Sequence, residues 1–97
     1  MTTSVGATPR TYDEILATLR EALVLVAPEV ADVYRADPAS IPAAASLKDD
    51  LGVDSLSLLE LVARAEYQFG LSVPDDDWPL LVSLDAIAMY VIAGGRP

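Results

Sequence analysis

Apolar residues between positions 11 and 27 recur with the 3.6-residue period of an α-helix. Thr11 followed by Glu14 makes a capping box, in which each side chain accepts a hydrogen bond from the other residue's backbone N–H at a helix start. Pro28 disfavours helical geometry in the residue before it, so the helix is expected to end there. The predicted buried stripe consists of Tyr12, Ile15, Leu16, Leu19, Leu23 and Val26.

The pattern weakens between residues 28 and 54. Residues 29–35 are compatible with a short helical continuation, whereas Asp37-Pro38 and Pro42 interrupt regular structure. A connection of this length in a compact domain is expected to be a functional loop anchored by apolar contacts. The candidate anchors are Ile41, Leu47 and Leu51.

A second helical pattern follows Gly52, which permits a tight turn. Either Asp54 or Ser55 is suited to cap this helix, and Gly70 is expected to end it. Its predicted buried face consists of Leu58, Leu61, Val62, Ala65 and Phe69.

Residues 73–78 predict an extended entry into one short helical turn, because Pro74 suits a helix start and the carboxylates at 75–77 suit its positive end. Ser83 then caps a last helix, which glycines 94 and 95 end. The apolar stripe predicted for this helix is Leu84, Ile87, Ala88, Val91 and Ile92.

These elements predict an all-α fold, a small antiparallel bundle of three main helices plus one short helix, with a long first connection. No strand pattern competes with them. The expected organisation is a flexible leader over residues 1–10, one domain over 11–93 and a tail over 94–97. Ala65 and Ala88 are expected to face each other, which leaves either room for an apolar chain or close helix packing.

The formal net charge is −9, from 15 acidic and six basic residues. A nucleic-acid surface is therefore not expected, because phosphate neutralisation needs clustered Lys and Arg. The acidity favours basic partners, or serves only the solubility of a small apolar protein. With no cysteine and no histidine, the chain lacks the usual nucleophile–base constellations, so we expect a non-enzymatic protein.

The longest apolar run, residues 22–27, is too short to cross a bilayer, and the first ten residues lack the apolar stretch of a signal peptide. A cytoplasmic monomer without membrane contact is the resulting expectation.

The most informative segment is Leu51-Gly52-Val53-Asp54-Ser55-Leu56. Glu60-Leu61 follows, and Phe69-Gly70 stands fourteen and fifteen residues after the serine, with Val73-Pro74-Asp75 beyond. In order and spacing these residues resemble the acyl carrier protein family. The resemblance covers roughly residues 11–93, with two departures: the first connection is longer than usual, and Ser83-Leu84 stands where Thr-Val is typical.

The resemblance implies that Ser55 carries a 4′-phosphopantetheine group. A serine at a helix start is exposed on a rigid element, and the helix dipole favours the added phosphodiester. Nothing in the sequence activates its hydroxyl, so a separate phosphopantetheinyl transferase using coenzyme A is the expected partner. Asp54 is expected to cap the helix, to help hold the magnesium ion of the transferase reaction, or both.

Three further residues are candidates for partner contact. Leu56 and Ala63 lie off the main buried stripe, as an exposed patch or as part of a wider core. Glu60 either docks on basic enzyme surfaces or belongs, with Glu66, Asp49 and Asp50, to a solvated face. The acidic run 75–77 suits capping and solubility better than metal binding, because consecutive residues do not converge from one helical face.

The predicted function is to hold acyl intermediates as thioesters and present them to acyl-transferring, condensing or adenylating enzymes of polyketide or fatty acid biosynthesis. Two alternatives remain open. One is a peptidyl or aryl carrier of a nonribosomal peptide-type pathway, although such carriers more often have a second Gly and then His or Asp before the serine. The other is an unmodified helical adaptor that binds partners through its acidic face.

Overall fold

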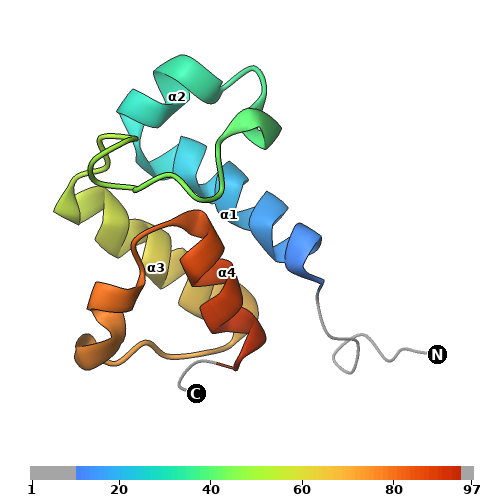
Figure 1. Cartoon of the computed structure of the whole chain (residues 1–97), viewed down its shortest axis with the longest axis vertical. Coiled ribbons are helices and arrows are strands. Elements are labelled where there is room, and N and C mark those ends of the chain that lie inside the picture. Colours follow the sequence, from blue (N-terminus) through green and yellow to red (C-terminus); the bar gives the residue numbers. More distant parts are fainter. Residues whose placement is uncertain (1–10, 95–97) are drawn as a thin grey trace.

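The computed structural model describes residues 11–94, which form four α-helices and two 3₁₀ turns without a strand (Figure 1). The predicted all-α fold is confirmed. The expected leader, and all of the expected tail except Gly94, lie outside the described residues. The elements are α1 (Tyr12–Val26), α2 (Pro28–Tyr34), η2 (Pro38–Ser40), α3 (Ser55–Phe69), η3 (Asp75–Leu80) and α4 (Leu84–Ile92).

The first helix is central, because α2, η2, α3 and α4 all pack against it. Its start is the predicted capping box: the N–H of Glu14 donates to Thr11 Oγ1 at 3.2 Å, and the N–H of Thr11 donates to Glu14 Oε1 at 3.0 Å. The predicted stripe of α1 is buried, except that Tyr12 is only partly covered. Its hydroxyl instead donates to Asp85 Oδ1 at 2.5 Å, which ties the start of α1 to the start of α4.

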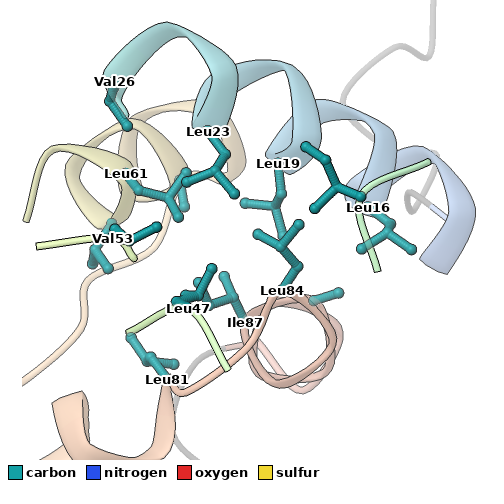
Figure 2. Close-up of a cluster of buried hydrophobic side chains, with 14 of the residues drawn as sticks. Leu16, Leu19, Leu23, Val26, Leu47, Val53, Leu61, Leu81, Leu84 and Ile87 are labelled. Carbon is teal, nitrogen blue, oxygen red and sulfur yellow. The ribbon is translucent and has the colours of Figure 1, made fainter. Parts of the chain in front are cut away.

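Leucines and valines from helices and loops share one core (Figure 2). Leu19 and Leu23 of α1 meet Leu61 of α3 and Leu84 of α4, and each of these four side chains is at most 1% exposed. Complete burial of such a side chain contributes about 1.5–3 kcal/mol. The core therefore fixes the position of α3, whose first two residues, Ser55 and Leu56, are the last two of the segment 51–56.

The long first connection is an anchored segment, as expected, although it contains α2 and η2. Ile41 and Leu47 are buried, whereas Leu51 is partly exposed. Arg20 of α1 donates from Nε and Nη2 to the carbonyl of Ile41 at 3.0 and 2.7 Å. The N–H of Leu47 donates to the carbonyl of Val82 at 2.9 Å. These bonds hold the connection between α1 and the approach to α4.

The stripe predicted for the last helix is confirmed at Leu84, Ile87 and Ala88, which are buried, and Val91 is partly buried, but the edge of this face differs from the prediction. Ile92 is 48% exposed, whereas Tyr90, which was absent from the predicted stripe, is buried. The Tyr90 hydroxyl donates to Asp77 Oδ2 at 2.6 Å. This bond makes burial of the polar end of Tyr90 favourable, so it takes a core position that an aliphatic residue was expected to fill.

The two small helix residues, Ala65 and Ala88, are both buried. Ala65 lines a cleft of about 100 Å³ between α3 and α1, together with Leu19, Ala22 and Phe69. Its neighbours across this cleft therefore come from α1 and not from α4. Among residues 11–94, no helix combines the length and the hydropathy that a membrane span requires.

Candidate functional site

The motif sits where the long connection enters α3. Gly52 has φ of +70°, a left-handed conformation that glycine adopts without strain. The buried Val53 follows, and its N–H donates to the carbonyl of Leu47 at 2.8 Å. The turn is therefore fixed to the core on one side while Asp54 and Ser55 remain exposed on the other.

Asp54 is the N-cap of α3, and Ser55 is the first helical residue. Asp54 Oδ1 accepts the backbone N–H of Ser57 at 2.8 Å, which satisfies one of the donors that a helix start leaves without a partner. The capping role expected for Asp54 is therefore present, and Ser55 itself does not cap. This hydrogen bond from Ser57 lowers the pKa of the Asp54 carboxyl.

Ser57 links the motif to α1. Its side chain is 6% exposed, and its hydroxyl donates to the carbonyl of Val26 at 3.0 Å. That carbonyl lies at the end of α1, and the N–H of Val30, four residues on, donates to the carbonyl of Ala27 instead. The hydroxyl therefore satisfies a buried acceptor and fixes the start of α3 against the end of α1.

Sequence reasoning missed Ser57 because a serine does not contribute to an apolar stripe. A signal was nevertheless present: positions 57, 61 and 65 are four residues apart, and Leu61 and Ala65 were both predicted to be buried. A hydroxyl at that position must find a buried acceptor.

Ser55 is suited to carry a group that extends into solvent. It is exposed, whereas the nearby serines 57 and 83 are 6% and 7% exposed, and Ser83 Oγ accepts the N–H of Ala86 as the cap of α4. A phosphodiester added to Ser55 would lie at the positive end of the 15-residue helix α3. The residues present thus fit a covalent phosphate-linked group at this position.

The three expected partner-contact residues share one exposed face of α3. Leu56 is 67% exposed, and Glu60 and Ala63 follow it at helical spacing and are also exposed. Glu60 and Ala63 line a shallow depression together with Arg64 and Tyr67. Leu56 and Ala63 therefore do not belong to a wider core stripe.

Several acidic residues have roles that the sequence did not reveal. Glu66 Oε2 accepts the N–H of Val73 at 2.8 Å, and Asp50 Oδ2 accepts the N–H of Ser46 at 2.8 Å, so these side chains order loops in addition to facing solvent. Asp77 is 7% exposed, whereas its neighbours Asp75 and Asp76 are exposed. The solubility role expected for residues 75–77 is therefore wrong for Asp77, which anchors η3 to α4. No group of three metal-ligating side chains gathers anywhere in residues 11–94.

Known proteins resemble this chain over most of its described residues. Residues 24–89 match the family defined by the phosphopantetheine attachment site. An acyl carrier protein of Bdellovibrio bacteriovorus is 42% identical over 60 residues, which cover 62% of this chain and 77% of that protein. One from Exiguobacterium is 35% identical over 81 residues, covering 84% and 94%.

A meromycolate extension acyl carrier protein of Mycobacterium bovis is 30% identical over 83 residues, covering 86% of this chain and 66% of that protein. The family match spans most of the described domain, including the whole of α3. The chain therefore belongs to the acyl carrier protein family, whose cofactor is 4′-phosphopantetheine.

Proposed function

We propose that Ser55 is the attachment site of the phosphopantetheine arm, and that the protein holds acyl intermediates on it as thioesters for enzymes of polyketide or fatty acid biosynthesis. The observation that carries the proposal is the exposure of Ser55 at the first position of α3, next to a carboxylate cap and inside the matched region. When bound, the arm supplies the thiol that the cysteine-free chain lacks.

Attachment requires Ser55 Oγ to form a bond to the phosphorus that bears the pantetheine half of coenzyme A. The pyrophosphate bond breaks, the nucleotide half leaves, and the serine proton passes to a base on the transferase. On this chain, α3 orients the hydroxyl. The carboxylate of the preceding residue, Asp54, caps α3, and its proposed second role is contact with the transferase's magnesium ion.

The test is the intact mass of the protein after incubation with coenzyme A and a phosphopantetheinyl transferase. We expect the added mass of one phosphopantetheine, lost in Ser55→Ala and retained in Ser72→Ala, which removes an exposed serine outside the helices. Modification of Ser55→Ala, or none of the wild type, would overturn the proposal. The second outcome would favour an unmodified adaptor.

Cargo class is tested by loading the modified protein with acyl-transferring and with adenylating enzymes. The curated relatives described above are named acyl carrier proteins, which favours acyl transfer over amino-acid activation. Loading only by adenylating enzymes would instead assign a peptidyl or aryl carrier.

The exposed face of Leu56, Glu60 and Ala63 is the proposed docking surface for these enzymes. It lies on the helix that begins with Ser55, so a bound enzyme would stand beside the arm. The net charge of −9 favours basic partner surfaces, and exposed charge pairs are screened within about 10 Å at 0.1 M salt. We expect Glu60→Lys to slow acyl transfer at low salt, whereas Glu29→Lys, on α2, should not. Equal rates for both variants and the wild type would refute electrostatic docking here.

A further inference from the structure

The cleft between α1 and α3 that Ala65 lines has a mostly apolar interior of about 100 Å³. Its apolar lining residues are Leu19, Ala22 and Leu25 of α1 and Ala65 and Phe69 of α3. Leu19 and Ala65 are buried, whereas Leu25 is 72% exposed. The cleft therefore extends from the core to the surface and has an exposed leucine at its edge.

One charge of each sign stands at this cleft. Glu21 of α1 and Arg64 of α3 both line it, and both are exposed. Arg64 is the one basic residue of α3, in a chain with 15 acidic and six basic residues. Within residues 11–94, no side-chain ion pair or hydrogen bond joins Glu21 or Arg64 to another residue. Both charges are therefore available to a bound molecule.

We propose that this cleft binds a helical segment of a partner protein, which inserts one aliphatic side chain and presents a carboxylate to Arg64 and a cation to Glu21. The inference does not depend on the attachment proposed for Ser55. It assigns the protein a second interaction surface, formed by α1 and α3 together.

The volume of the cleft selects the side chain that enters it. An apolar cavity of about 150 Å³ holds a benzene ring. At about 100 Å³, the cleft suits a branched aliphatic side chain better than an aromatic one. Because Leu19 and Ala65 belong to the core, the cleft is formed before a partner arrives, and little conformational entropy is lost when the partner binds.

A second hollow continues from the same residues. Arg64 and Gln68 line both the cleft and the shallow depression that includes Tyr67, which is 88% exposed. Aromatic residues and arginine are enriched in protein interfaces, whereas Asp and Glu are depleted there. Leu25, Arg64 and Tyr67 thus give this side of an acidic protein the composition of an interface.

Geometry and charge favour a helix of a different protein as the occupant. Two neighbouring helices leave a groove into which a third helix packs through side chains three or four residues apart. Those side chains can include an aliphatic residue with a charge of each sign beside it. A second copy of the chain is not favoured, because two copies that each carry a net charge of −9 repel one another.

The experiment selects binders of the unmodified full chain from a displayed library of helical peptides. Their length is about 15 residues, at which isolated helices begin to form. We expect the enriched peptides to share an aliphatic residue that has Asp or Glu three or four positions away and Lys or Arg on its other side. In NMR titrations of the isotope-labelled protein, they should shift the amide resonances of Ala22, Leu25, Arg64 and Gln68.

Two partly buried alanines provide a matched pair for the cleft. Ala22→Leu fills the cleft, whereas Ala86→Leu enlarges a residue of α4 outside it. We expect the enriched peptides to bind Ala22→Leu at least about tenfold more weakly, because their aliphatic side chain is excluded, and to bind Ala86→Leu like the wild type. Circular dichroism shows whether both variants are folded.

Charge reversal tests the contact with Arg64. A peptide whose acidic residue is changed to lysine should bind Arg64→Glu more tightly than it binds the wild type. Arg35→Glu changes the net charge equally from an exposed position at the end of α2, and it should not have this effect. Equal gains in the two variants would show that only net charge attracts the peptide, and would overturn the proposal.

The proposal also fails if no peptide is enriched, or if the enriched peptides bind folded Ala22→Leu as tightly as the wild type. Enrichment of basic peptides without an aliphatic residue would contradict it as well. Sedimentation of the chain as a dimer that Ala22→Leu dissociates would place a second copy in the cleft and overturn the assignment to a separate partner.

Discussion

Replacing Ser57 with alanine tests whether one buried hydroxyl positions the start of α3. The substitution removes the hydrogen bond from Ser57 Oγ to the carbonyl of Val26, which is 3.0 Å long and buried. The backbone N–H of residue 57 remains, so the cap bond to Asp54 is preserved. The change therefore isolates the contact between α3 and α1.

The expected loss in the free energy of unfolding depends on which hydrogen-bond donors remain for the carbonyl of Val26. In the described residues the carbonyl has no backbone donor outside the helix ladder, because the N–H of Val30, four residues on, donates to Ala27 instead. A buried acceptor left unsatisfied costs about 1–3 kcal/mol. For a domain of this size each kcal/mol lowers Tm by about 4–8 °C.

Urea unfolding followed by circular dichroism measures this loss, with Ser55→Ala as the matched control two residues away. Ser55 is exposed, so its substitution is expected to change the free energy of unfolding by at most about 0.5 kcal/mol. Amide hydrogen exchange in the first turn of α3 should also accelerate in Ser57→Ala. If both variants unfold at the same urea concentration, the hydroxyl does not hold the two helices together and the reasoning is refuted.

Three other substitutions probe the supports of the site. Tyr90→Phe removes the donor to the buried Asp77 carboxylate and should cost about 1.5–3 kcal/mol in urea unfolding, and a cost near zero would refute the anchoring of η3. Arg20→Met keeps the aliphatic stem but loses both hydrogen bonds to the carbonyl of Ile41, so the free energy of unfolding should fall by about 0.5–1.5 kcal/mol. Amide hydrogen exchange in the connection should become faster, and exchange at the wild-type rate would contradict this expectation. The folded-state pKa of Asp54 is lowered from 3.8, so its ionised form stabilises the fold above pH 3.8 and this contribution disappears as pH falls through the lowered value. The stability advantage of the wild type over Asp54→Ala should therefore shrink in acid, and a difference independent of pH between 7 and 2 would show that the charge is irrelevant.

Local signals in the sequence were sufficient to predict where the helices that contain or precede the site begin and end. The capping box at Thr11, the cap at Asp54 and the stop at Gly70 depend on residues within a few positions of one another, and all three are present in the structure. The same holds for the placement of Ser55, because helix starts are set by the chain immediately around them. The resemblance to the family motif is the basis for proposing that position as the attachment site of the cofactor.

Side chains that act across long sequence separations were not predictable in this way. Ser57 reaches Val26, and Asp77 reaches Tyr90, through contacts that exist only once the helices have packed. Tyr90 took a buried position and Ile92 an exposed one because a hydrogen bond available only in the folded chain favoured burial of the phenol.

Periodicity, capping and motif spacing are local properties, and they were enough to predict α1, α3 and α4, the helix-start position of Ser55 and the family resemblance. Chain packing, by contrast, brings Trp78 of η3 and Ser55 of α3 into the lining of one groove, since 23 positions separate the two residues in the chain. It also decided which polar groups are buried. Such a group is stable only where a distant partner satisfies it, and chain packing, not local pattern, supplies that partner.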